Sequence, residues 1–203
     1  MNVSILTQVD VEALRATVFH GLIAPAECGA LIEIARVREA KASVCDNDTG
    51  AIRVDTYSVQ PAVRSNTMSW VDNAHPLVRS LNQRITALTG IPLENQEPLQ
   101  VLHYRPGEEY VPHHDAFTPG NPQLEHGGNR IATVILYLNS VPAGGGTFFP
   151  EMDIRVFPHA GLGLFFRSVK DGQVLQKSLH AGEPVLQGEK WIATKWIRER
   201  AYV

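Results

Sequence analysis

The sequence changes character near Pro98, and this change constrains the fold more than any other feature. Before it, residues 25–38 and about 76–88 have the apolar spacing of amphipathic helices. After it, short runs rich in β-branched and aromatic residues alternate with clusters of glycine, proline and asparagine. This order predicts an α+β chain, with a double-stranded β-helix (jelly-roll) core and N-terminal supporting helices on one outer face. The runs expected to form strands are Leu99–Tyr104, Ile131–Leu138, Gly163–Arg167 and Trp191–Arg198.

The chain length bounds the number of domains. A chain of 203 residues suits one well-cored domain and leaves little room for a second. We expect a single domain over 1–203, with helical support at about 20–95 and the jelly-roll core at about 98–198. Between Ala40 and Ala62 the sequence has no clear periodicity, so we expect loops there, with room for a strand.

Composition and charge argue against several classes of function. The net charge is -3 and the basic residues are scattered, so nucleic acid is a poor candidate partner. No segment approaches the roughly 20 apolar residues that span a bilayer, and the N-terminus lacks the features of a secretory signal. We therefore expect no membrane association and a cytoplasmic location. Cys28 and Cys45 have no metal-binding spacing and are expected to be reduced structural residues.

The strongest chemical feature is the segment 110–115, Tyr-Val-Pro-His-His-Asp, followed downstream by His180. Two histidines and one carboxylate are the ligand set of a facial triad, which leaves three positions open on Fe(II). In an extended segment side chains alternate, so His113 and Asp115 project to one side and His114 to the other. We expect a metal on His113, Asp115 and His180. The same ligand types also suit Zn²⁺ with an activated water, a hydrolytic alternative.

Lys190, ten residues after His180, distinguishes these alternatives. A 2-oxoglutarate cosubstrate chelates iron through its 1-carboxylate and 2-oxo group, so its distal carboxylate points into the fold and needs a cation. The compact ammonium of lysine can serve there, whereas a hydrolytic zinc site has no need of it. By alternation, one face of the last predicted strand presents Lys190, Ile192, Thr194 and Trp196.

Several motifs, in the same order, resemble the prolyl 4-hydroxylase branch of the 2-oxoglutarate oxygenases. The resemblance runs from about His20 to the C-terminus. The family pattern Tyr-x-x-Gly-x-x-Tyr-x-x-His-x-Asp occurs at 104–115, and Arg-x-Ala-Thr with Tyr-Leu-Asn occurs at 130–139. The closing pattern occurs at 180–185 and 188–197.

The resemblance implies an Fe(II) enzyme with 2-oxoglutarate and O2 as cosubstrates, and it leaves room for ascorbate. By position it implies iron on His113, Asp115 and His180, the distal 2-oxoglutarate carboxylate on Lys190, Tyr104 and Thr147, and a substrate groove lined by Tyr110, Arg130 and Trp196. Such a groove suits an extended, proline-containing peptide, whose rings and lack of donors favour aromatic walls.

Two departures from the family pattern concern the substrate more than the reaction class, because neither touches an iron ligand. Residues 144–147 read Gly-Gly-Gly-Thr where many relatives have Gly-Gly-Glu-Thr, which removes a carboxylate beside the cosubstrate anchor. Glu183 stands where many relatives have cysteine.

Ordinary structural roles are the alternative for each residue. Aromatic core packing would explain Tyr104, Tyr110 and Trp196; a strand start would explain Thr147, and a surface ion pair Arg130. The remaining histidines, His20, His75, His103, His126 and His159, are expected to be ordinary surface or core residues. The same is expected of His114, with support of a neighbouring ligand as the alternative.

The leading prediction is hydroxylation of prolyl residues in a peptide or protein, with release of succinate and CO2. One alternative is the same chemistry on a free amino acid or other small molecule, because fold and cosubstrate site do not fix the substrate. Charge disfavours a nucleic-acid demethylase. A non-catalytic jelly-roll binding module is the alternative from another class, disfavoured by the intact ligand set and Lys190. The sequence leaves open the oligomeric state and the position and stereochemistry of hydroxylation.

Overall fold

The computed structural model describes residues 3–9, 14–45, 52–54 and 63–203. Its two α-helices are α1 (Pro25–Arg36) and α2 (Pro76–Thr89), and neither is long and apolar enough to cross a membrane. The strands within the described residues are β1 (Ser4–Val9), β2 (Ala16–His20), β3 (Ala40–Lys41), β4 (Ser43–Cys45), β5 (Ile52–Val54), β6 (Thr67–Val71), β7 (Leu99–Tyr104), β8 (Tyr110–His113), β9 (Arg130–Tyr137), β10 (Ala143–Gly144), β11 (Thr147–Phe149), β12 (Ile154–Val156), β13 (Leu162–Arg167), β14 (Val169–Lys170), β15 (Gln173–Val174), β16 (His180–Gly182), β17 (Val185–Gln187) and β18 (Lys190–Arg198).

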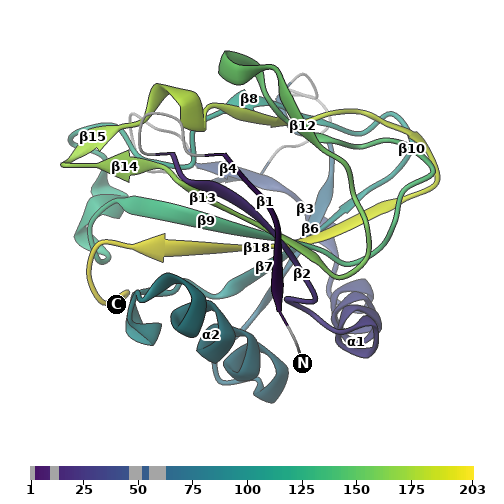
Figure 1. Ribbon diagram of the computed structural model, residues 1–203, viewed down its shortest axis with the longest axis horizontal. Coiled ribbons are helices and arrows are strands. Elements are labelled where there is room, and N and C mark those ends of the chain that lie inside the picture. The colour runs from purple at the N-terminus through teal and green to yellow at the C-terminus, as the bar shows by residue number, and fades with distance from the viewer. Residues whose placement is uncertain (1–2, 10–13, 46–51, 55–62) are drawn as a thin grey trace.

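Two antiparallel sheets form the core of the molecule. The major sheet has eight strands in the order β1-β2-β13-β9-β18-β7-β6-β3, and the minor sheet has four in the order β12-β11-β16-β8. Figure 1 shows both helices on the outer side of the major sheet and the minor sheet on the opposite side. The architecture is the α+β jelly roll with supporting helices that the sequence predicts.

Each helix buries one face against the major sheet. Pro25 begins α1, and Cys28, Leu31 and Ala35 are its buried positions. Glu27 accepts a hydrogen bond from the backbone N–H of Ala24 and so caps the helix. Helix α1 therefore starts at Pro25 and turns its apolar face to the core, as its sequence pattern predicts.

One ion pair joins the two helices. The Arg84 guanidinium of α2 lies 2.6 Å from Oε1 of Glu27, and it also donates to the carbonyl oxygen of Leu22. Because both charged groups are largely shielded from solvent, the pair fixes how α2 lies beside α1.

The apolar side chains form two clusters, one on each face of the major sheet. The cluster under the helices includes Leu31, Leu81, Val101 and Leu136. The cluster between the two sheets includes Tyr104, Ile135, Tyr137, Phe149 and Phe166. The functional pocket described below opens from the second cluster, so the sheets position its side chains.

The N-terminal region supplies more strands than its sequence pattern indicated. β2 pairs with β13 and, together with β1, extends the major sheet. β6 lies inside the region expected to be helical support and pairs with β7. The runs of β1, β2 and β6 are short and lack strong alternation, which hides them from pattern reasoning. In the segment from Ala40 to Ala62, β3, β4 and β5 are short strands, and the rest lies largely outside the described residues.

The buried side chain of Leu136, next to the last residue of β9, provides a test of the packing. Leu136→Ala removes atoms from a fully buried site and is expected to lower the free energy of unfolding by about 2–5 kcal/mol. Leu186→Ala, at a residue 73% exposed, is the matched control and should change it by less than about 0.5 kcal/mol. Urea unfolding followed by circular dichroism measures both; equal effects would contradict the packing described.

Candidate functional site: a metal centre with a buried lysine

Two histidines and an aspartate meet on the minor sheet. His113 ends β8 and His180 begins β16, and the two residues are register partners in this antiparallel pair. Asp115 follows β8, and the ligand atoms of all three residues lie within 4.8 Å of one another. Nε2 of His113 is 3.6 Å from Asp115 Oδ1, and Nε2 of His180 is 3.7 Å from Oδ2. The structure therefore brings together the three predicted metal ligands.

Backbone carbonyls determine which nitrogen of each histidine faces the metal position. Nδ1 of His113 lies 2.9 Å from the carbonyl oxygen of Val111, and Nδ1 of His180 lies 2.9 Å from that of Ser178. A carbonyl oxygen only accepts hydrogen bonds, so each Nδ1 carries a proton. The Nε2 lone pairs are then free for a metal.

The carboxylate of Asp115 is buried and oriented. Thr133 Oγ1 donates to its Oδ2 at 2.6 Å. Burial alone would raise the pKa of Asp115, but His180 and His113 beside it outweigh burial and hold this pKa well below its usual range. Burial, with His113 nearby, lowers the pKa of His180 to about 4. At neutral pH the site thus offers a carboxylate and a neutral imidazole, the states that bind a divalent metal.

The pocket that contains the triad also contains the three residues predicted to hold the distal carboxylate. Pairing of β18 with β7 places Lys190 opposite Tyr104, with Nζ 4.9 Å from the centre of the phenol ring. Thr147 comes from β11, and its Oγ1 accepts a hydrogen bond from the hydroxyl of Tyr137 at 2.7 Å. Burial raises the pKa of Tyr104 to about 12, so its hydroxyl stays protonated and able to donate.

Lys190 carries a buried amino group. It is 1% exposed, and Nζ has no hydrogen-bond or ion-pair partner in the part of the chain that the structure describes. Burial lowers the pKa of Lys190 to about 7, although Glu183 opposes this shift. Lys190 and Gly182 both line the pocket that contains the metal triad. A buried ammonium that lines a pocket fits an anionic group of a ligand.

The two departures from the family pattern meet in space. The backbone at Gly146 is outside the left-handed region, so its conformation does not require glycine. A Cβ there, however, would lie 2.6 Å from Glu183 Oε2. Oε1 of Glu183 pairs with Arg155 Nε at 2.9 Å. The carboxylate of Glu183 thus lies where a side chain at position 146 would begin.

A groove of about 310 Å³ adjoins the metal triad. Its lining includes His113 and Asp115, together with all three residues predicted to contact substrate: Tyr110, Arg130 and Trp196. The Tyr110 ring stacks on the imidazole of His113, with centroids 3.6 Å apart. The groove therefore leads directly to the metal ligands.

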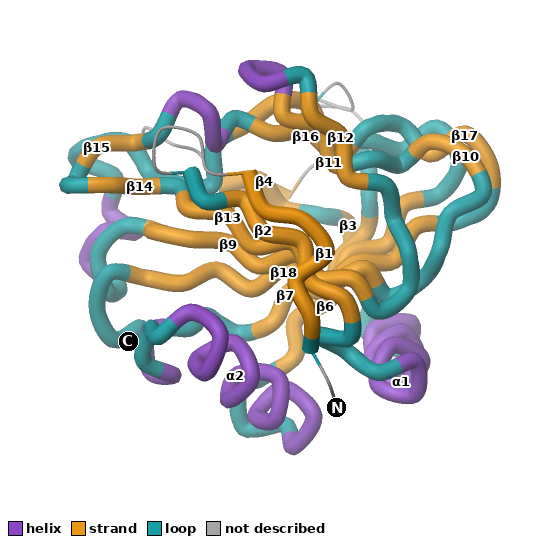
Figure 2. Tube along the Cα trace, in the orientation of Figure 1, coloured by secondary structure: helices purple, strands orange, loops and turns teal. Residues whose placement is uncertain are grey.

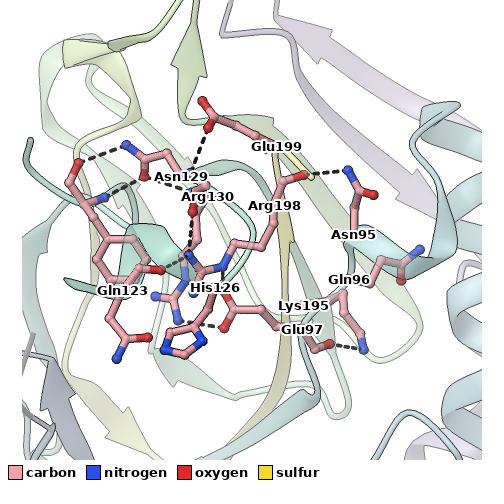
Figure 3. Close-up of polar contacts among 12 residues, drawn as sticks. Asn95, Gln96, Glu97, Gln123, His126, Asn129, Arg130, Lys195, Arg198 and Glu199 are labelled. Atoms are coloured by element: carbon pink, nitrogen blue, oxygen red, sulfur yellow. Dashed lines mark hydrogen bonds and ion pairs between the residues drawn. The ribbon is translucent and has the colours of Figure 1, made fainter. Parts of the chain in front are cut away.

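Arg130 is both ion-paired and part of the groove wall. Its Nε and Nη2 lie 2.7 and 2.9 Å from the two carboxylate oxygens of Glu97, and its guanidinium stacks 3.6 Å above the ring of Trp196. Burial would raise the pKa of Glu97, but Arg130 and Arg198 outweigh it and lower this pKa. Figure 3 shows Glu97 beside Arg130 and Arg198. Both guanidinium groups donate to this one carboxylate, which holds them in place.

Sequence reasoning missed several groove residues. The guanidinium of Arg64 lies 4.7 Å above the ring of Tyr110, and Trp70 lies 6.0 Å from Trp196, centroid to centroid. Glu97 was also missed, although the sequence offers a sign of it: it is a charged residue just before the predicted strand Leu99–Tyr104. Other missed lining residues include Gln100, Phe117, Gln123 and Tyr202.

The remaining histidines and cysteines have other surroundings. His114 Nδ1 lies 3.2 Å from Ser178 Oγ, and so contacts the residue whose carbonyl holds His180. The His103 ring stacks on a tryptophan away from the metal site. Cys28 is buried in the core, and the side chain of Cys45 lies outside the described residues.

Comparisons with known proteins agree with this geometry. A model of the 2OG-Fe(II) oxygenase superfamily matches residues 99–198. Over 92% of its length the chain is 36% identical to prolyl 4-hydroxylase 1 of Arabidopsis thaliana, of which it covers 70%. It is also 36% identical, over 90% of its length, to prolyl 4-hydroxylase subunit alpha-1 of Rattus norvegicus, of which it covers 34%.

The solved structures that resemble the chain share its fold. The 2OG complex of viral collagen prolyl hydroxylase vCPH from Paramecium Bursaria Chlorella virus-1 has a TM-score of 0.71 at 25% identity, over 90% of this chain and 94% of that one. A Pseudomonas putida prolyl-4-hydroxylase has a TM-score of 0.63 at 20% identity, over 94% and 96% of the two chains, and so supports the fold.

The alternation at 113–115 provides a matched pair of variants. His113→Ala removes a ligand and is expected to weaken metal binding by more than about 100-fold, beyond the usual cost of losing an outer hydrogen-bond partner. His114→Ala should weaken it by less than about 10-fold, because His114 supports the site only through Ser178. Titration with Co(II), followed by its visible absorption, measures both affinities. Similar losses in the two variants would contradict the ligand assignment.

Proposed function

Because this chain belongs to the 2OG-Fe(II) oxygenase superfamily, in its prolyl 4-hydroxylase branch, we propose that it hydroxylates prolyl residues of a peptide or protein. The observation that carries the proposal is the groove, with walls of aromatic rings and a guanidinium, that leads to the metal ligands. Flat apolar faces suit proline rings, and a chain without backbone donors suits a wall rich in donors.

The residues of the triad fit Fe(II), the metal of this superfamily, through two imidazole Nε2 atoms and one carboxylate. When bound with 2-oxoglutarate and O2, Fe(II) supplies the oxidation that inserts one oxygen atom into a substrate C–H bond, while 2-oxoglutarate becomes succinate and CO2. The protein holds the ligands in fixed orientations through Val111, Ser178 and Thr133.

We assign the distal carboxylate of 2-oxoglutarate to Lys190, Tyr104 and Thr147. The ammonium of Lys190 supplies the charge, and the hydroxyl groups of Tyr104 and Thr147 supply hydrogen bonds. This carboxylate would give Lys190 the counter-charge that it lacks within the described residues. The three side chains thus orient the cosubstrate and keep its end in a dry pocket.

We assign the substrate to Tyr110, Arg130 and Trp196. The indole N–H of Trp196 is buried and has no acceptor among the residues that the structure describes. A carbonyl oxygen of a bound peptide would satisfy this donor. Glu97 holds the guanidinium of Arg130 in the wall, so the wall is formed before substrate arrives. The cytoplasmic location stays a prediction from the sequence alone.

The function is tested with the Fe(II)-loaded protein under air, by measuring succinate and the mass of a proline-rich peptide in one sample. The expected result is peptide-stimulated succinate, with one oxygen atom added to the peptide per succinate formed. Arg130→Ala should raise the peptide KM and leave the 2-oxoglutarate KM unchanged, and Lys190→Ala should do the reverse. Succinate stimulated by free proline but not by the peptide would replace the proposal with a small-molecule hydroxylase.

The depressed pKa of Lys190 predicts how 2-oxoglutarate binding depends on pH. Below about pH 7 Lys190 is an ammonium and attracts the carboxylate; above it the free amine must first take up a proton. The 2-oxoglutarate KM of the wild type is therefore expected to rise by up to about 10-fold per pH unit above this pKa.

Lys190→Arg is the matched control, because a guanidinium stays charged at these pH values. Its 2-oxoglutarate KM is expected to be higher than that of the wild type at pH 6.5 but independent of pH. A wild-type KM that stays constant from pH 6.5 to 9 would contradict the role of Lys190.

A further inference from the structure

We propose that Tyr202, held in place by residues 199–201, forms part of the wall of the substrate groove and makes the enzyme prefer peptides that extend beyond the reacting proline. The inference rests on the proposed function, since it concerns which peptides that function accepts. Tyr202 lines the groove but not the inner pocket that holds the triad and Lys190. It therefore faces parts of a peptide outside the reacting residue.

Tyr202 ends a continuous series of aromatic rings and guanidinium groups in contact with one another. Trp70 and Trp196 begin it, with centroids 6.0 Å apart. The guanidinium of Arg130 lies 3.6 Å from the Trp196 ring and 4.8 Å from that of Phe117. The next contacts continue from Phe117 through Arg198 to Tyr202, at 4.9 and 5.5 Å.

All but Arg198 line the groove, and Arg198 joins the last two rings from behind. Its Nε pairs with Glu97 at 2.5 Å, and Nη1 donates to the carbonyl oxygens of Gln123 and Gly128. Since Arg198 is 1% exposed and held at three points, the position of its guanidinium is fixed. Figure 3 shows the polar contacts around Arg198. The ring of Tyr202 therefore packs on a rigid support.

Backbone hydrogen bonds hold the segment itself in place. The N–H groups of Glu199 and Arg200 donate to the carbonyl oxygens of Asn129 and Gly127, and Tyr202 N–H donates to Glu94 at 2.8 Å. These bonds tie the segment to the turn before Arg130 and to the turn before β7. An ordered backbone of this kind can hold one ring in a defined place.

Close approach at Gly127 adds to this docking. Gly127 has a φ of 100°, and a Cβ there would lie 2.7 Å from the carbonyl oxygen of Ala201. Both the conformation and the contact therefore require glycine. The Gly-Gly-Asn turn before Arg130 is thus shaped to receive residues 199–201, which explains a motif that the catalytic site does not use.

An exposed ring at the rim of a groove has a simple use in binding an extended peptide. The side chain of Tyr202 is 37% exposed, so it is not part of the apolar core. Its hydroxyl can stay in water while the ring contacts an apolar side chain of the peptide. Proline or another flat residue several positions from the reacting one would bury this ring. A peptide too short to reach it would gain nothing.

The test compares two substrates, a capped tripeptide with a central proline and a longer proline-rich peptide with the same centre, extended on both sides. The wild type should have the lower KM for the longer peptide. Tyr202→Ala should raise that KM by roughly 3- to 10-fold, the range for loss of one aromatic contact. It should leave kcat, the tripeptide KM and the 2-oxoglutarate KM unchanged.

Two further variants separate the ring from other effects. Tyr202→Phe keeps the ring and should behave as the wild type. Val203→Ala changes a neighbouring side chain that is 82% exposed and outside the groove lining, so it should also behave as the wild type.

Two outcomes would overturn the proposal: an unchanged KM for the longer peptide in Tyr202→Ala, or an equal rise for both peptides and 2-oxoglutarate, which indicates a structural role. A wild type that hydroxylates neither peptide but forms succinate with a small molecule would instead reject the proposed prolyl function.

Discussion

The antiparallel pairing of β18 with β7 and β9 is the constraint on which the rest of the structure depends. It sets Lys190 opposite Tyr104 and Trp196 opposite Thr133. Side chains alternate along a strand, so Lys190 and Trp196 face the pocket while Lys195 faces the helices, where its Nζ donates to Asn73 and to a backbone carbonyl. A slip of one residue would exchange the two faces and place the wrong lysine in the pocket.

One buried carboxylate organises the groove in a similar way. Glu97 accepts hydrogen bonds from Arg130, 33 residues later, and from Arg198, 101 residues later. Removing this carboxylate would leave two buried guanidinium groups close together, which is far more costly than the absence of all three charges. The binding surface is therefore held by a long-range ion network, because the side chains that face substrate are supported from behind.

Local patterns in the sequence were enough to predict the metal ligands, the buried lysine and the two supporting helices. The alternation at 113–115 identified His113 over His114, and the spacing along the last strand placed Lys190 and Trp196 on one face. The structure agrees with both, because a period of two follows from the backbone alone. Helices α1 and α2 were also expected, within a few residues of their observed ends.

The residues that were missed depend on pairings between distant segments. Trp70 reaches the groove only because β6 pairs with β7, and Tyr202 only because the turn at Gly127 receives its segment. β1 and β2 are likewise defined by their neighbours in the sheet rather than by a pattern of their own. No local pattern in the sequence indicates such contacts. The sequence therefore predicts the catalytic centre more completely than the substrate groove.

The space shared by Gly146 and Glu183 has a consequence for recombination between related enzymes. A side chain at position 146 and the carboxylate of Glu183 compete for one volume, so a residue larger than glycine at position 146 is incompatible with Glu183 as it is placed here. A chimaera that took residues up to about 160 from a relative with glutamate at position 146, and the remainder from this chain, would place two carboxylates in that volume. The reverse chimaera would leave Arg155 without the carboxylate of Glu183. Crossover points for shuffling this family therefore belong outside the segment between the two positions.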